Sequence, residues 1–179
     1  MTARVHQGGR SVTVQLGPVS FHSSRIPVTG PPREVLNETI VVAGQALRYC
    51  CASVGNPHCV VLRDAVSPDE AQKWGPLIER DPRFPSRTNV QFMQVLDRSH
   101  IRIEIWERGA GYTLASGSSS CAAASVAHRL GLCDARIAVS MPGGTIDISI
   151  AEGGAVWMTG AVTKVCDGEI SQEMFTTQL

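Results

Sequence analysis

Residues 106–132, with the sequence WERGAGYTLASGSSSCAAASVAHRLGL, constrain the fold more than any other stretch of the chain. The stretch indicates a strand end, a glycine-rich turn and a helix. Serine and glycine at residues 116–120 favour a helix start, because a side-chain oxygen or a bare backbone can serve the unpaired amides there. Gly131 is a natural stop. Since the first turns carry almost no side-chain bulk, we predict a helix that packs tightly inside other structure.

The start of this helix is a candidate anion site. A buried helix start preceded by small residues offers free backbone N–H groups and a partial positive charge, which suit a carboxylate or a phosphate. Glu107 and Arg108 lie just before it, so a ligand that carries both charges could be recognised at both ends. The pattern also fits a core helix with a polar cap, and the residues alone leave both interpretations open.

Composition excludes several classes of protein. The 179 residues fit one large domain or two small ones, and 16 basic against 16 acidic side chains leave no net charge. This is not the basic footprint of a nucleic-acid binder. No apolar run is long enough to span a bilayer, and the N-terminus lacks the layout of a secretion signal. We therefore expect a cytoplasmic protein without nucleic-acid or membrane partners.

The six cysteines lie in apolar stretches of sequence, and in a reducing compartment buried free thiols are the common outcome. Three of them, with His58, could suggest a metal site. However, a CC pair followed by HC is not a zinc spacing, and neighbouring strand residues point to opposite faces. We therefore expect no metal. The cysteines are Cys50, Cys51, Cys59, Cys121, Cys133 and Cys166.

Most of the remaining chain alternates as strands do. A second helix begins after the capping Ser67 and ends by Arg80, before a Pro-rich turn. Its predicted apolar stripe consists of Ala71, Trp74, Leu77 and Ile78. The predicted strands cover residues 11–16, 39–42, 46–53, 59–62, 88–95, 100–106, 135–141, 144–150 and 155–165.

Two details of this pattern bear on the core. Alternation in residues 100–106 directs Ile101, Ile103 and Ile105 inward, and we expect Arg102 and Glu104 on a solvated face. The polar residues 169–179 are expected to be partly loose. The chain also opens in strand-like material with little lead-in, which is compatible with a fragment or with a chain that lacks a preceding domain.

Three stretches together resemble the diaminopimelate epimerase family of cofactor-independent amino-acid epimerases. They are GNPH at residues 55–58, TNVQF at 88–92 and ERGAGYTLASG at 107–117, followed by CAAA at 121–124. Their order and separation are similar to those in the second half of that family. Each stretch is a weak signal alone, and the resemblance covers nearly all of the chain.

The resemblance implies an α+β fold with two pseudo-symmetric lobes, each a curled, mostly antiparallel sheet around a central helix. Residues 1–179 would then be a single C-terminal lobe, with the first lobe absent. It also implies that the substrate's α-carboxylate lies on the amides near Gly117 and Ser118. The other substrate-binding residues it implies are Asn56, Asn89, Glu107 and Arg108. Judged alone, Asn56 also fits a residue that merely holds its turn.

The implied reaction is the interconversion of LL- and meso-diaminopimelate in lysine biosynthesis, without pyridoxal phosphate or another cofactor. Two departures from the family matter. The first lobe, with its own cysteine in a CGNG-like motif, has no counterpart here. The second catalytic cysteine corresponds to Ser116, and a hydroxyl is a far weaker acid than a thiol and needs an adjacent base. Cys121 matches a noncatalytic family cysteine, and Tyr112 replaces a frequent Glu.

Three functions stay open from the sequence. The chain could be an epimerase whose first lobe comes from another chain or from a homodimer, and which we expect to be impaired alone. It could be a pseudoenzyme that binds an amino acid or another carboxylate without turnover. It could also be a fold-related isomerase of another metabolite.

Overall fold

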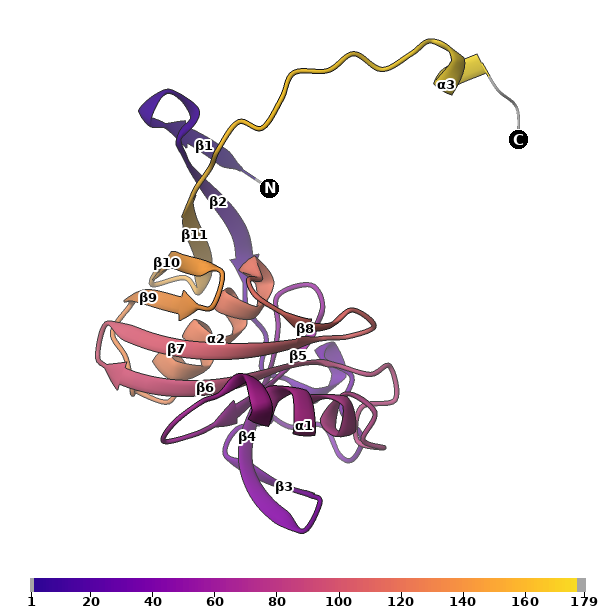
Figure 1. Ribbon diagram of the computed structural model, residues 1–179. Coiled ribbons are helices and arrows are strands. Elements are labelled where there is room, and N and C mark those ends of the chain that lie inside the picture. The colour runs from indigo at the N-terminus through magenta and orange to yellow at the C-terminus, as the bar shows by residue number, and fades with distance from the viewer. Residues whose placement is uncertain (1, 177–179) are drawn as a thin grey trace.

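One continuous sheet of 11 strands carries the fold, as the computed structural model of residues 2–176 shows (Figure 1). The strands are β1 (Ala3–His6), β2 (Ser11–Pro18), β3 (Glu38–Val42), β4 (Gln45–Ser53), β5 (Pro57–Leu62), β6 (Asn89–Asp97), β7 (His100–Glu107), β8 (Gly111–Thr113), β9 (Arg136–Met141), β10 (Gly144–Ile150) and β11 (Ala155–Ala161). The helices are α1 (Pro68–Glu79), α2 (Gly117–Arg129) and α3 (Glu173–Thr176), with 3-10 turns η1 (Gln7–Gly9) and η2 (Ser23–Arg25).

The strand order is β1-β2-β11-β10-β9-β7-β6-β5-β4-β3, and β8 pairs with β7. All neighbours are antiparallel except β5 with β6 and β7 with β9. The sheet curls around α2, which contacts strands from β4 to β11, while α1 packs on β6, β7 and β8 (Figure 1). The sheet is not closed. This arrangement confirms the predicted α+β class and the curled, mostly antiparallel sheet around a central helix.

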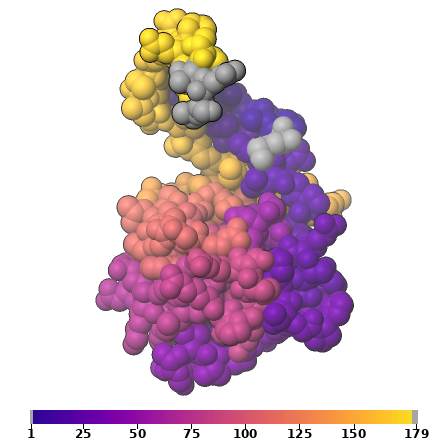
Figure 2. All heavy atoms as spheres, turned by 90° about the vertical axis from the view of Figure 1, so that its right-hand side faces the viewer, coloured from indigo at the N-terminus to yellow at the C-terminus, as the bar shows by residue number. Residues whose placement is uncertain are grey.

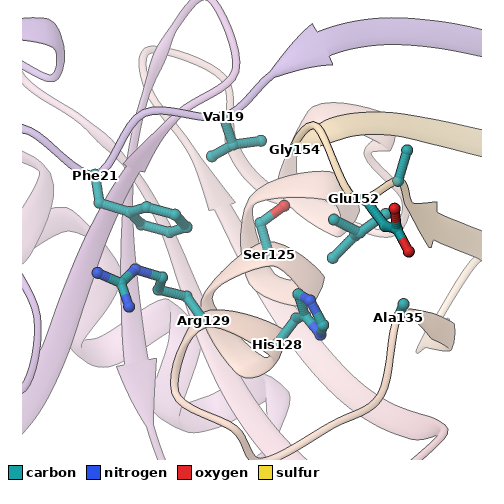
Figure 3. A pocket seen from close by; sticks show the side chains of 10 residues that line it. Val19, Phe21, Ser125, His128, Arg129, Ala135, Glu152 and Gly154 are labelled. Atoms are coloured by element: carbon teal, nitrogen blue, oxygen red, sulfur yellow. The ribbon is translucent and has the colours of Figure 1, made fainter.

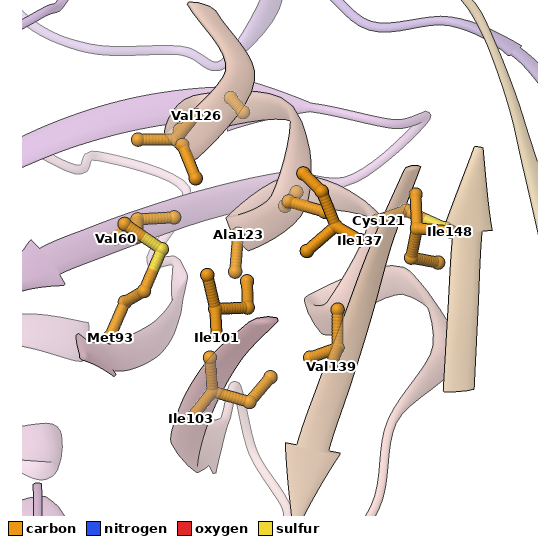
Figure 4. Packing of buried hydrophobic residues seen from close by; sticks show 14 of the residues in the cluster. Val60, Met93, Ile101, Ile103, Cys121, Ala123, Val126, Ile137, Val139 and Ile148 are labelled. Carbon is orange, nitrogen blue, oxygen red and sulfur yellow. The ribbon is translucent and has the colours of Figure 1, made fainter. Parts of the chain in front are cut away.

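Helix α2 fits inside the curl because its side chains are small. Residues 121–124 (CAAA) are fully buried, and so are Ile101 and Ile103 of β7. Figure 4 shows Ala123 facing Ile101, and Cys121 beside Ile148. Val139 and Ile137 of β9 complete this side of the core. Larger helix residues would hold the sheet away, since protein interiors are packed at crystal-like density.

The predicted ends of α2 are confirmed. Ser116 is the N-cap, and its hydroxyl accepts the Ser119 N–H at 3.4 Å. At the other end Gly131 has a φ of +71°, the left-handed conformation that favours glycine after a helix.

Helix α1 begins as predicted, with the Ser67 hydroxyl accepting the Glu70 N–H at 3.3 Å. Ala71, Trp74 and Ile78 are buried, but the prediction for Leu77 was wrong because this side chain is 50% exposed. The face that packs on the sheet continues through Gly75 and Glu79 instead, one and two turns from Ala71. Leu77 lies to the side of this face.

Strand β7 is covered on both faces. Ile101, Ile103 and Ile105 are buried against α2 as predicted. The expectation that Glu104 is solvated was wrong: it is 0% exposed, because α1 and β8 cover that face, and it accepts the Tyr112 hydroxyl at 2.6 Å. Burial, helped by this carboxylate, raises the pKa of Tyr112 to about 12.

An arm projects from the body of the molecule (Figures 1 and 2). It consists of β1, β2, the end of β11 and the exposed residues 162–176. Strand β1 was not predicted, and β2 continues through Gly17 and Pro18, which were expected to break it. Strand β8 also escaped prediction, since it has three residues. Of the expected loose tail, residues 169–176 are exposed, and 177–179 lie outside the described residues.

The six cysteines are free thiols, and five are buried. The expectation of apolar surroundings was wrong for Cys166, which lies exposed on the arm. Within residues 2–176, no three His, Cys, Asp or Glu side chains gather where they could hold a metal ion. In the same part of the chain, no helix has both the length and the apolar character required to cross a membrane.

A substitution at Gly75 tests the contact between α1 and β7. A Cβ atom there would lie 2.5 Å from Trp106 Cγ and 2.6 Å from its Cβ, which are not free to move away. We expect Gly75→Ala to lower the free energy of unfolding by about 2 kcal/mol, although alanine favours helices. Urea denaturation measures this. Gly153→Ala is the matched control, since its Cβ meets nothing within 4 Å; equal stabilities of the two variants would contradict the packing.

Candidate functional site

Strand pairing brings most of the predicted site residues to one edge of the sheet. Strand β5 runs parallel to β6, with His58 opposite Asn89, so both strands start at this edge. Strand β7 runs antiparallel to β6, with Trp106 opposite Val90, so β7 ends here and leads into Glu107 and Arg108. The hydrogen bond between Gln91 of β6 and Ser119 in the first turn of α2 brings the start of the helix to the same edge.

Asn89 ties two turns of this edge together. It is 7% exposed, its Nδ2 donates to the Pro57 carbonyl at 2.9 Å, and its Oδ1 accepts the Arg108 N–H at 3.0 Å. The segment that carries Asn56 and the segment that carries Arg108 are therefore fixed relative to one another by one side chain. Its contact with a ligand stays a prediction.

A buried polar chain continues from there to the helix. His58 Nε2 lies 3.0 Å from Asn56 Oδ1, and Gln91 Nε2 donates to Ser119 Oγ at 3.0 Å. Within residues 2–176, His58 Nδ1 and Gln91 Oε1 have no hydrogen-bond partner in this orientation of the Gln91 amide. Gln91 neighbours His58, and turning its amide by 180° would let Nε2 donate to His58 Nδ1 and Oε1 accept from the Ser119 hydroxyl.

The residues of this hydrogen-bonded series differ in how far the sequence points to them. His58 belongs to the GNPH stretch but was not assigned to the site, because a histidine in such a turn is usually structural. Gln91 and Ser119 were missed. A glutamine within an otherwise apolar strand was the available signal, since a buried amide requires partners.

Burial lowers the pKa of His58 to about 4; the nearby Gln91 amide opposes this shift, and the charge of Arg108 adds to it. The imidazole is therefore neutral at physiological pH. If Nε2 carries the proton toward Asn56, Nδ1 is an acceptor that points into the protein.

Two backbone donors at the start of α2 are available for a ligand. Ser116 accepts the N–H groups of Ser119, through its hydroxyl, and of Ser120, through its carbonyl at 3.1 Å. The Gly117 and Ser118 N–H groups have no acceptor within residues 2–176. Both residues are half-buried.

The cavity that borders this helix start has a volume of about 280 Å³ and lies toward β2 and β11. Its other lining residues are apolar, and include Val12, Ile146 and Met158. None of the predicted polar site residues lines it. The predicted groups thus share one edge of the sheet but do not surround this cavity.

Glu107 is the last residue of β7, and Arg108 begins the turn to β8. Glu107 is half-buried and its Oε2 lies 3.5 Å from the Thr113 hydroxyl. Arg108 is exposed, and its Nη1 donates to the Ser86 carbonyl at 2.9 Å. Both side chains keep polar atoms free for a ligand.

Glu79, which sequence reasoning missed, holds this turn in place. The carboxylate is 2% exposed; its Oε2 accepts Trp106 Nε1–H at 2.7 Å and its Oε1 accepts the Gly109 N–H at 3.2 Å. Arg87 Nη1 lies 3.6 Å from Oε1. The residues on either side of Glu107 and Arg108 are therefore anchored to the end of α1.

Cys121 does not replace the missing thiol at position 116. It is 0% exposed on the buried side of α2, and burial raises its pKa to about 12. A thiol with this pKa is protonated at neutral pH and is a poor base.

We expect Glu79→Ala to lower the free energy of unfolding by about 2 kcal/mol, because it removes the acceptor of the half-buried Trp106 Nε1–H and of the Gly109 N–H. The turn at Glu107 and Arg108 should loosen as well, which faster hydrogen exchange at the Gly109 amide would report. Glu169→Ala, on the exposed tail, is the control. Unchanged protection of Gly109 would show that Glu79 does not hold the turn.

The buried His58 should make stability depend on pH. Its folded pKa of about 4 lies below the ordinary value of 6.5, so the unfolded state binds more protons between these values. Stability is therefore lost as the pH falls from about 6.5 to about 4, by roughly 3 kcal/mol for this group. Urea denaturation near pH 7.5 and near pH 4 should show a smaller loss for His58→Gln than for the parent. The control His6→Gln, at an exposed histidine, should lose as much stability as the parent. An equal loss in all three proteins would show that His58 is not the source of the pH dependence.

The sequence matches the family model of diaminopimelate epimerase over residues 50–165. Diaminopimelate epimerase 2 of Nostoc sp. (strain PCC 7120) is 54% identical over 174 residues, which are 97% of this chain and 61% of that protein. Diaminopimelate epimerase of Stutzerimonas stutzeri (strain A1501) is 42% identical over 160 residues, 89% of this chain and 58% of that protein. The chain thus spans about three fifths of the length of these relatives.

A solved structure of a probable proline racemase from Agrobacterium radiobacter K84 is similar in fold. The TM-score is 0.66 at 13% identity, over 97% of this chain and 58% of that one. At this identity the likeness establishes a shared fold and no shared substrate.

Proposed function

The chain belongs to the diaminopimelate epimerase family, and from this premise we propose that it is the second lobe of a cofactor-independent amino-acid epimerase. The proposed substrate is diaminopimelate, interconverted between its LL and meso forms in lysine biosynthesis. We propose the cytoplasm as the location, since six free thiols fit a reducing compartment.

One observation carries the proposal. The unpaired N–H groups of Gly117 and Ser118 stand at a helix start, at the sheet edge that also holds Asn89 and the turn of Glu107 and Arg108. Amides at a helix start bind carboxylates, and a negative charge there is stabilised by the helix dipole. The substrate's α-carboxylate would occupy these donors.

The neighbouring side chains would recognise the rest of the substrate. Glu107 suits an ammonium group and Arg108 suits a carboxylate, so together they fit a ligand with both charges. Asn56 Oδ1 and both polar atoms of Asn89 are engaged, but an amide oxygen accepts two hydrogen bonds and an NH₂ group donates two. Each atom therefore keeps capacity for a ligand.

The active site would be completed by another lobe. Inversion at a carbon requires a base on one face and an acid on the other, and this chain supplies one face. The half-buried helix start and the exposed arm support a partner lobe, either on a separate chain or from a second copy of this one. In a homodimer, two copies of Ser116 would face the substrate.

Ser116 favours a second candidate, a protein that binds an amino acid without turnover. A serine hydroxyl requires an adjacent base to remove a carbon-bound proton, whereas a thiolate at a helix start does not. The Ser116 hydroxyl instead caps α2 and lies 3.5 Å from the Ser118 hydroxyl. An isomerase of another metabolite with a different acid–base pair is the third possibility.

We expect no exchange of the α-proton when the chain is incubated alone with LL-diaminopimelate in D₂O, as measured by mass spectrometry. Ser116→Cys should introduce exchange of the α-proton if the catalytic base is the single group that the substrate site lacks. Ser140→Cys, on β9, controls for an added thiol. Rapid exchange by the unmodified chain would contradict the proposed impairment.

Binding separates the epimerase-type site from an unrelated one. A diaminopimelate isomer should raise the melting temperature, and Arg108→Ala should abolish this shift because it removes the cation at the site. Arg98→Ala, in the exposed ion pair with Asp134, should keep the shift. Absence of a shift with both isomers and with a broad panel of amino acids would overturn the proposed binding site.

A further inference from the structure

A second cavity lies at the opposite end of α2 from Ser116 (Figure 3). Its volume is about 350 Å³, within the range of small-molecule sites. The chain after β2, the last turns of α2 and the turn between β10 and β11 form its walls. No group of the proposed epimerase site lines it.

An unpaired hydroxyl lies at the inner end of this cavity. Ser125 is 4% exposed, and its Oγ has no hydrogen-bond partner among the residues that the structure describes. Helical serines commonly donate to a carbonyl one turn earlier, but Ser125 does not, and Figure 3 shows its oxygen directed into the space between Val19 and Gly154. A buried hydroxyl without a partner is unfavourable, so a ligand that bonds to it gains affinity.

The walls between this hydroxyl and the solvent are apolar. Val19 and Phe21 come from the chain after β2, and Ile150 comes from the end of β10. Ala135 and Gly154 are small and leave the space open (Figure 3). The ring of Phe21 is half-buried and lines the cavity, where it suits an aromatic partner, because aromatic pairs contribute beyond their buried area.

The mouth carries charges of both signs on opposite sides (Figure 3). Arg129 is neutralised by Glu34, with Nη2 and Oε2 2.6 Å apart. Glu152 is exposed and forms no ion pair or side-chain hydrogen bond with residues 2–176. His128 lies between these two residues, and its Nδ1 is 3.3 Å from the Cys133 carbonyl oxygen. Of the fixed charges at the mouth, the uncompensated one is therefore negative, and it favours a cationic group.

We propose that this cavity binds a small aromatic amine that carries a hydroxyl at the end opposite its ammonium group. The hydroxyl bonds to Ser125, the ring packs on Phe21, Val19 and Ile150, and the ammonium group pairs with Glu152. A phenolic amine and the corresponding amino acid share this chemistry. The site does not depend on the proposed epimerase function, since it uses none of the same residues.

Calorimetric titration and amide NMR of the full chain test the proposal with tyramine. Tyramine should bind and shift the amide signals of Phe21, Ser125 and Gly154. Phenethylamine, which lacks the hydroxyl, should bind about fivefold more weakly, and p-cresol, which lacks the amine, roughly threefold more weakly. Tighter binding of L-tyrosine than of tyramine would identify the amino acid as the preferred form, and the reverse would identify the amine.

Two variants isolate the interactions. Ser125→Ala should weaken tyramine about fivefold and leave phenethylamine unchanged. It should also keep or raise the melting temperature, because the hydroxyl has no partner to lose, so misfolding would not explain the result. Glu152→Gln should weaken both amines but not p-cresol, and Glu169→Gln on the tail is its control.

The proposal is overturned by equal affinity for the three probes, or by signal shifts confined to the arm or to the start of α2. It is also overturned if shifts at the cavity appear on raising the protein concentration without a probe. A second copy of the chain would then cover this surface.

Discussion

The burial of α2 inside the curled sheet is the constraint on which the rest of the structure depends. Alanine and cysteine at residues 121–124 let strands from both halves of the sheet approach the helix axis. Because the side chains of this helix are small and tightly packed, the positions of its two ends relative to the sheet are fixed. The start thereby meets β6, through the Gln91–Ser119 hydrogen bond, and the last turns line a cavity with the chain after β2.

The candidate site is built by polar side chains that are themselves buried. Asn89 links two turns, Gln91 links β6 to α2, and Glu79 links α1 to the turn of Glu107 and Arg108. Buried polar groups of this kind are costly unless paired, and paired they fix the geometry of what they hold. Ligand-facing groups can then stay exposed, as Arg108 does, without losing their position.

Much of this could be predicted from the sequence. The small residues of α2, the capping serines and the alternation of the strands each reflect a local preference, and these features were placed correctly within a few residues. Glu104, Leu77 and Glu79 depend on which element covers a given face, and no local pattern records that. Short strands such as β8 form because a neighbour offers hydrogen bonds, so they too escape prediction. The sequence motifs predicted that Asn89 and Arg108 belong to one site. The hydrogen bond from the Arg108 N–H to Asn89 Oδ1, which joins them, could be seen only in the structure.

Strand β1 has consequences for the behaviour of the molecule in solution. It pairs with β2 on one side, and its other side carries backbone N–H and C=O groups at the end of the sheet. Such an edge is a template for adding a further strand from another molecule. The polar Arg4 and His6 flank the exposed Val5, and Arg4 lies over the ring of Trp157 at 5.2 Å. Polar side chains on such a strand oppose its pairing with a further copy of the chain.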